Sequence, residues 1–91
     1  MVKLVEVVKE IASYRLREVF INPKHIISLR EDDNMKKKLN EGKLPNALDE
    51  RQNFTKVILD KGTSGQELIV IGDPVQIEKK LRSNKKEVLY G

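Results

Sequence analysis

Apolar and polar residues alternate in several short segments of the chain, and a period of two residues is typical of β-strands with one covered face. Asn22 and Pro23 interrupt the pattern, because Asn-Pro favours a turn and proline cannot donate to a sheet ladder. A further segment is continuously apolar, as in a strand covered on both faces. The pattern predicts five strands, at residues 2–8, 14–21, 26–30, 54–61 and 68–71.

The first of these segments also fits a helix, because Leu4, Val7, Val8 and Ile11 have helical spacing. Valine is abundant in it, however, and β-branched residues favour the extended conformation. We therefore predict a strand there.

The residues after the last strand carry the signals of a helix start. Asp73 can cap the first turn, Pro74 suits the first helical position, and Gln76 follows Asp73 at the spacing of a capping box. A helix N-terminus can also bind an anion, but Asp73 would repel one, so we interpret this turn as a capped strand-to-helix connection. Ile77 and Leu81 lie four residues apart and can share a face toward the sheet.

These elements predict one α+β domain at residues 1–82: a small, mostly antiparallel five-stranded sheet with the C-terminal helix packed on one face. Residues 83–91 are expected to form a frayed, basic C-terminal tail. The residues expected in the core are Leu16, Phe20, Ile27, Leu29, Val57, Leu59, Ile69, Ile71, Ile77 and Leu81.

Residues 31–53 form a long polar excursion between two strands, and we expect a short helix in it. Asp33 or Asn34 can cap this helix, while Met35 and Leu39 lie four residues apart on its inner side. A second helical turn is expected near Asn46.

Metal binding and catalysis have little support in the residue types present. The acidic residues 31–33 lack the alternating oxygen ligands and the glycine of a calcium loop. His25 is the only histidine and cysteine is absent, so we expect His25 to be exposed or hydrogen-bonded near a turn. Residues 62–65, GTSG, lack the Gly-Lys-Ser/Thr of a phosphate loop and indicate a hairpin turn. We predict no catalytic residue, no cofactor and no metal.

The basic residues are distributed unevenly. Residues 1–78 carry 13 basic and 13 acidic residues, whereas residues 79–91 carry five basic residues and one acid, so the net charge of +4 arises at the C-terminal end. Without cysteine there is no disulfide framework, and no apolar run reaches the ~20 residues of a membrane span. The N-terminus also lacks the apolar region of a signal peptide, so we expect a cytoplasmic protein.

A first hairpin is followed by short motifs at residues 20–23, 26–27, 55–59 and 69–71, and then by Ile77 and Leu81. This order of parts resembles the small flagellar and swarming-motility proteins, a family of compact β-rich domains that end in a helix. The similarity covers roughly residues 2–30 and 54–82, and residues 31–53 depart from the family pattern. The segment 17–32, REVFINPKHIISLRED, is also similar to short proteins of tailed cyanophages, which would imply the cytoplasm of a host cell. Neither resemblance implies a catalytic residue.

A small enzyme is one alternative, which would be favoured if a change of His25 abolished turnover without unfolding the domain. Two binding functions have more support. The first is a protein-interaction or homo-oligomerising module, because a domain of this size leaves a sheet edge or face open for another protein or a second copy. The second is nucleic-acid binding, since clustered cations attract phosphate, although aromatic residues for base stacking are few. The candidate nucleic-acid-binding residues are Lys79, Lys80, Arg82, Lys85 and Lys86.

Overall fold

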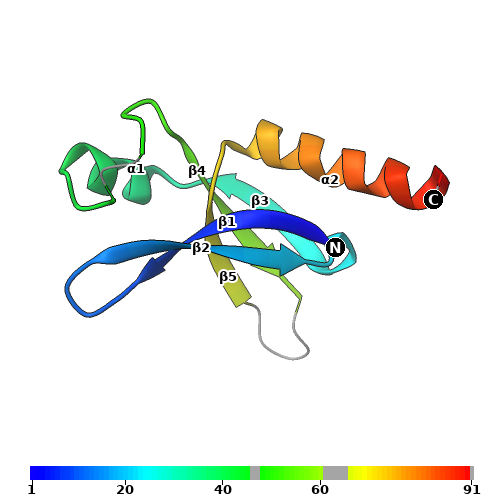
Figure 1. Ribbon diagram of the computed structural model, residues 1–91, viewed down its shortest axis with the longest axis horizontal. Helices are drawn as coiled ribbons and strands as arrows, with labels where there is room; N and C mark the ends of the chain where they lie inside the picture. Colours follow the sequence, from blue (N-terminus) through cyan, green and yellow to red (C-terminus); the bar gives the residue numbers. More distant parts are fainter. Residues whose placement is uncertain (46–47, 61–65, 91) are drawn as a thin grey trace.

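The computed structural model describes residues 1–45, 48–60 and 66–90, with the backbone alone for residues 84–90. It confirms the predicted α+β class: a five-stranded, all-antiparallel sheet with one helix after the third strand and one at the C-terminus (Figure 1). The elements are β1 (Val2–Lys9), β2 (Tyr14–Ile21), the 3-10 turn η1 (Pro23–His25), β3 (Ile26–Glu31), α1 (Asp33–Asn40), β4 (Phe54–Leu59), β5 (Gln66–Ile71) and α2 (Pro74–Tyr90).

The strand order in the sheet is β2-β1-β5-β4-β3, so β2 and β3 are the two edge strands. In a flat sheet these two edge strands would lie about 19 Å apart, at roughly 4.8 Å per strand spacing. Only residues 22–25 connect them, and three of these residues form the compact turn η1. Because so short a connection cannot span a flat sheet, the sheet curls and brings the two edges together at the η1 end.

One face of the sheet is covered by α2, and we call it the α2 face. Its apolar side chains come from all the elements of the curled sheet, and α2 adds Ile77, which is fully buried. The buried members of this cluster are Val2, Leu4, Ile21, Val57, Leu68, Val70 and Ile77.

The predicted capping box fixes the direction in which α2 leaves β5. The Gln76 backbone N–H donates to Asp73 Oδ1 at 2.8 Å, and the Asp73 N–H donates to Gln76 Oε1 at 3.0 Å. Gly72 precedes them with a φ of 115°, a conformation that L side chains rarely adopt. Thr55 Oγ1 donates to the Gly72 carbonyl at 2.7 Å, so the turn is also fastened to β4.

The opposite face, the α1 face, is covered by the excursion after β3. Asp32 caps α1, because its Oδ1 accepts from the backbone N–H groups of Asn34 and Met35. The prediction placed the cap one or two residues later, at Asp33 or Asn34. Lys36 Nζ donates to the carbonyls of Glu50 and Gln52 at 2.7 and 2.8 Å and ties the returning loop to the helix. The buried side chains of this second cluster are Val7, Met35, Leu44 and Phe54.

The prediction that Phe20 and Ile27 lie in the core is wrong, because both side chains are exposed. Ile27 is 63% exposed because the β3–β4 register shifts between Ile26 and Ser28, so Ile27 is the extra residue of a β-bulge and leaves the alternation. Phe20 is 62% exposed because it lies on the α1 face at the end of β2 that the excursion does not reach. The other eight predicted core residues are buried or pack against the two clusters.

The C-terminal segment also differs from the prediction. The backbone of α2 continues to Tyr90, so most of the expected frayed tail is helical, and its last turns extend past the sheet (Figure 1). Residues 2–8 are a strand, as predicted. The hairpin loop 62–65 and the turn expected at Asn46 lie outside the described residues. Within the described part of the chain, no helix is long and apolar enough to cross a membrane.

Candidate functional site

The cations proposed for nucleic-acid binding share one helix. Lys79, Lys80 and Arg82 are exposed on α2, and Arg82 pairs with Glu78 one turn earlier. Lys85 and Lys86 belong to the same helix, but their side chains are outside the description. Beside the start of α2 a shallow depression of about 360 Å³ is lined in part by Lys79, Lys80 and Gln76. The structure thus places all five cations on one helix and shows three of them exposed.

The strand β2 is an open edge of the sheet. It pairs with β1 over its whole length, from Tyr14 opposite Lys9 to Ile21 opposite Val2, and no strand pairs with its other side in the described residues. It holds no proline and no bulge, which are common devices for blocking an edge. The other edge, β3, has the bulge at Ile27.

The β1–β2 hydrogen-bond pattern determines which backbone N–H and C=O groups of β2 point to the free edge. The Glu10 N–H donates to the Ser13 carbonyl at 2.8 Å, so this pair next to the β1–β2 ladder is hydrogen-bonded. Because hydrogen-bonded and non-bonded pairs alternate in antiparallel strands, every second residue of β2 directs its N–H and C=O away from β1. These outward-facing residues are Tyr14, Leu16, Glu18 and Phe20.

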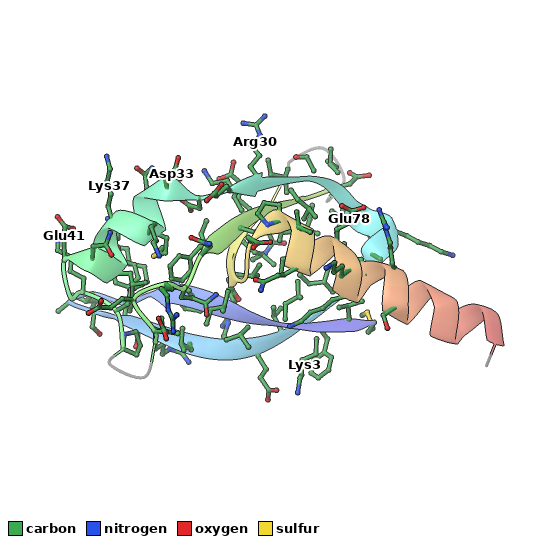
Figure 2. All side chains as sticks on the ribbon, turned by 90° about the horizontal axis from the view of Figure 1, so that it is seen from above. Lys3, Arg30, Asp33, Lys37, Glu41 and Glu78 are labelled. Carbon is green, nitrogen blue, oxygen red and sulfur yellow. The ribbon has the colours of Figure 1, made fainter. Side chains whose placement is uncertain are left out.

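The side chains along this edge are already paired within the chain or are apolar. Lys3 Nζ lies 2.9 Å from Glu18 Oε2, and Figure 2 shows Lys3 pointing away from the body of the molecule. Arg15 Nε lies 3.4 Å from Glu10 Oε1. Phe20 is the large apolar side chain exposed here. The edge therefore has open backbone groups and an uncovered aromatic ring, with its charges internally compensated.

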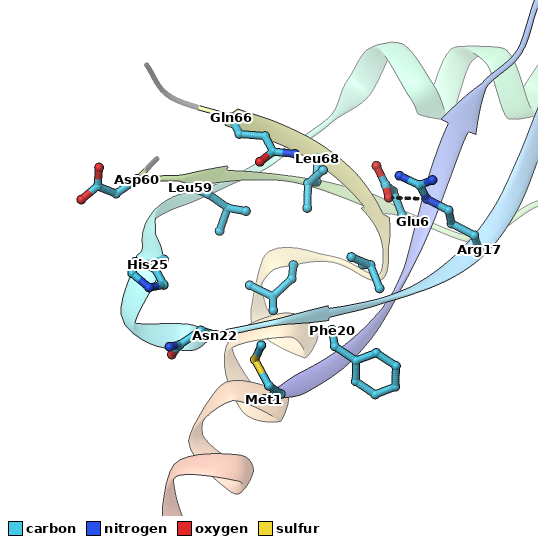
Figure 3. Close-up of a pocket in the computed structure, with 12 residues that line it drawn as sticks. Met1, Glu6, Arg17, Phe20, Asn22, His25, Leu59, Asp60, Gln66 and Leu68 are labelled. Carbon is cyan, nitrogen blue, oxygen red and sulfur yellow. Dashed lines mark hydrogen bonds and ion pairs between the residues drawn. The ribbon is translucent and has the colours of Figure 1, made fainter. Parts of the chain in front are cut away.

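A cleft of about 310 Å³ opens on the concave side of the curled sheet, between β2 and the β4–β5 pair. Val19, Ile21, Leu59 and Leu68 form its apolar walls, with Met1 and Phe20 at its margin (Figure 3). The volume is at the lower end of the range seen for small-molecule sites.

Polar groups lie at two ends of the cleft. At one end Arg17 Nε donates to Glu6 Oε1 at 3.0 Å (Figure 3). The Glu6 side chain is 10% exposed and that of Arg17 is 51% exposed. At the other end lie His25 and Asp60, whose segments are joined by a 2.7 Å hydrogen bond from the Asp60 N–H to the His25 carbonyl. His25 is exposed at the end of the turn η1, in agreement with the expectation from the sequence.

Glu6 and Arg17 were not among the predicted site residues. A signal was present, because an acid on the inward-facing side of an otherwise apolar strand must find a partner. The register of the β1–β2 hairpin then places Glu6 opposite Arg17. Asp60 and Leu68 line the same cleft as this ion pair only because the sheet curls, and no local sequence pattern indicates that curl.

Of the acidic residues 31–33, Glu31 ends β3, Asp32 is the N-cap of α1 and Asp33 lies in the first turn of α1. Among the described residues, no three or more His, Cys, Asp or Glu side chains gather as metal ligands would. At Asp49 the pKa is lowered by hydrogen bonds from the Arg51 side chain and backbone, and the Lys36 charge adds to this effect. Asp49 lies on the surface of the excursion, away from the cleft lining.

Comparison of the chain with models of known protein families, with curated proteins and with solved structures found no match. The resemblance to the flagellar and swarming-motility proteins, and that to cyanophage proteins, therefore stay predictions.

Proposed function

We propose that this protein is a non-catalytic, homo-oligomerising interaction module whose β2 pairs with β2 of a second copy. The observation that carries the proposal is the open edge: eight residues without proline or bulge, next to the exposed ring of Phe20. A cytoplasmic location belongs to the same proposal, supported by a chain without cysteine.

Antiparallel pairing of two copies satisfies the backbone of the edge. A two-fold axis perpendicular to the sheet gives an isologous contact, in which the outward-facing residues of each β2 exchange hydrogen bonds with those of the other. Opposite residues share a face, so Phe20 of one copy lies on the same side as Leu16 and Tyr14 of the other. Either neighbour would cover the exposed ring.

The charges of β2 do not oppose this contact strongly. Arg17 is bound to Glu6, and Glu18 is bound to Lys3, before any partner arrives. The two-fold axis would place Arg17 opposite Arg17, or Glu18 opposite Glu18, at the centre of the interface. In either case each like charge already has its own opposite charge within its chain, Glu6 for Arg17 and Lys3 for Glu18. This arrangement lowers the repulsion that like charges opposite each other would otherwise produce.

The test is sedimentation equilibrium of the full chain from about 1 µM to about 1 mM, a range that covers weak and moderate dimers. We expect a dimer for the wild type and a monomer for Phe20→Asp. Ile27→Asp is the matched control, because Ile27 is equally exposed but lies on the opposite edge, and we expect it to leave the dimer intact.

A backbone variant separates edge pairing from simple hydrophobic contact. Glu18→Pro removes an N–H that points away from β1, so the intrachain ladder keeps its hydrogen bonds while the free edge loses a donor. We expect this variant to keep its circular dichroism spectrum and to be monomeric. A wild type that stays monomeric up to about 1 mM, or an Ile27→Asp variant that dissociates as readily as Phe20→Asp, would overturn the proposal.

Nucleic-acid binding is the second candidate, and the exposed cations of α2 favour it. It is tested by fluorescence anisotropy with labelled duplex DNA and RNA at low and moderate salt. Binding that falls steeply with salt and is lost when the cations are changed to glutamine would support it. No binding at low salt would remove it. The residues to change are Lys79, Lys80, Arg82, Lys85 and Lys86.

A further inference from the structure

The cleft between β2 and the β4–β5 pair combines apolar walls with a nearly buried carboxylate. Its lining residues carry two carboxylates, Glu6 and Asp60, and two cations, Arg17 and the α-ammonium group of Met1. The charges of the lining therefore balance, and the local position of Glu6 decides which ligand fits. A carboxylate beside apolar walls is complementary to a cation with an apolar body.

Glu6 is the group that gives the cleft its polarity. Its carboxylate is buried among apolar walls, yet Arg17 Nε is the one side-chain donor to it in the described residues. An ionised carboxylate has about four acceptor positions, so Glu6 retains capacity for a second donor. A donor that arrives with a positive charge would form a charge-assisted hydrogen bond in a partly water-excluded site, where such bonds are strongest.

We propose that this cleft binds an amphipathic primary amine, with its ammonium group against Glu6 and its carbon chain on Val19, Leu59 and Leu68. The ligand class is an alkyl or arylalkyl ammonium ion, and a free amine and a lysine side chain share this chemistry. An anionic ligand is disfavoured because Arg17 already uses Nε for Glu6, is half exposed to water, and lies beside the Glu6 carboxylate, which would repel an anion. The inference does not depend on self-association.

The test is a titration of the isotope-labelled full chain followed by two-dimensional amide NMR, at pH 7. The probes are hexylamine, hexanol and hexanoate, which share a chain and differ in the head group. We expect saturable shifts centred on Val19, Leu59 and Leu68 for hexylamine, with a dissociation constant of about 1 mM, as befits so small a ligand. Hexanol should bind about tenfold more weakly and hexanoate more weakly still.

The variant Glu6→Gln should weaken hexylamine about tenfold, because a charge-assisted hydrogen bond becomes a neutral one. Glu41→Gln removes an equal charge from the excursion, outside the cleft lining, and should leave hexylamine binding unchanged. The wild-type probe series decides the question even where Glu6→Gln does not fold. No saturable shifts, shifts centred elsewhere, or hexanoate binding as tightly as hexylamine would overturn the proposal. N-acetyl-lysine methylamide binding more tightly than hexylamine would identify a peptide lysine as the form of amine preferred.

Discussion

Arg17 and Glu6 join the first two strands through one unequal ion pair. The Arg17 Nε to Glu6 Oε1 distance is 3.0 Å, and the two residues stand opposite each other in the β1–β2 register. The carboxylate is nearly buried while the guanidinium is half exposed. Because the buried partner bears the greater cost of losing water, Glu6 depends on Arg17 more than Arg17 depends on Glu6.

Removing Arg17 should therefore destabilise the domain more than removing a surface arginine from the same strand. We expect Arg17→Ala to lower the free energy of unfolding by about 1–3 kcal/mol, the usual cost of leaving a buried polar group without its partner. Arg15→Ala is the control, because Arg15 pairs with Glu10 and both side chains are 51% exposed. It should change stability by less than about 1 kcal/mol. Urea denaturation measures both, and equal losses would show that burial of Glu6 has no energetic weight.

Helix α2 depends on one buried anchor. Ile77 is fully buried in the α2-face core, whereas Val75, two residues earlier on the same helix, is 60% exposed. Ile77→Ala should cost about 2–5 kcal/mol, through lost burial and the cavity that remains. Val75→Ala should stay within about 0.5 kcal/mol. A melting temperature unchanged in Ile77→Ala would mean that α2 does not pack on the sheet as described.

Gly72 is required by both conformation and space. Its φ is 115°, and a Cβ added there would lie 3.2 Å from Ile77 Cδ1. Gly42 also has a positive φ, 75°, but a Cβ there would meet nothing within 4 Å. We expect Gly72→Ala to cost about 1–3 kcal/mol and Gly42→Ala about 1 kcal/mol, because Gly42→Ala introduces strain alone. Thermal unfolding of the two variants compares them, and a smaller loss at Gly72 would contradict the described turn.

The elements that could be predicted from sequence are those decided by neighbouring residues. The α2 start is one, since Asp73 and Gln76 form both hydrogen bonds of the capping box. The strand limits at Tyr14 and Ile21 are another, because alternation ends where Asn22 begins a turn. Such features depend on period, caps and turns, which a short window of sequence contains.

Features decided by distant contacts could not be predicted. The bulge at Ile27 depends on how β3 pairs with β4, and the exposure of Phe20 depends on where α1 and its loop come to lie. The cleft brings Glu6 and Arg17 near Leu68 and Asp60 through the curl of the sheet. The ion pair itself was within reach of the sequence, since the hairpin register sets Glu6 opposite Arg17, but the apolar walls that bury it were not.

Asp49 should titrate at lower pH than an ordinary aspartate. Hydrogen bonds from the Arg51 side chain and from its backbone N–H, the latter 2.7 Å from Oδ1, hold its pKa below the usual 3.8. A carboxyl whose pKa is depressed on folding favours the folded state above the unfolded pKa and loses that contribution as pH falls through the folded pKa. The loss therefore begins near pH 3.8 and is complete at lower pH.

The measurement is an NMR titration of the Asp49 side-chain carboxyl carbon between neutral and strongly acidic pH. We expect a midpoint below 3.8 in the wild type and a higher midpoint in Arg51→Gln, which loses the charged side chain, the largest cause of the shift. The backbone hydrogen bond stays in that variant, so part of the shift should persist. Lys43→Gln removes the same charge from the same excursion, where Lys43 pairs with Glu41, and should leave the midpoint in place. A midpoint that moves equally in both variants would attribute the shift to general charge and not to the Arg51 hydrogen bonds.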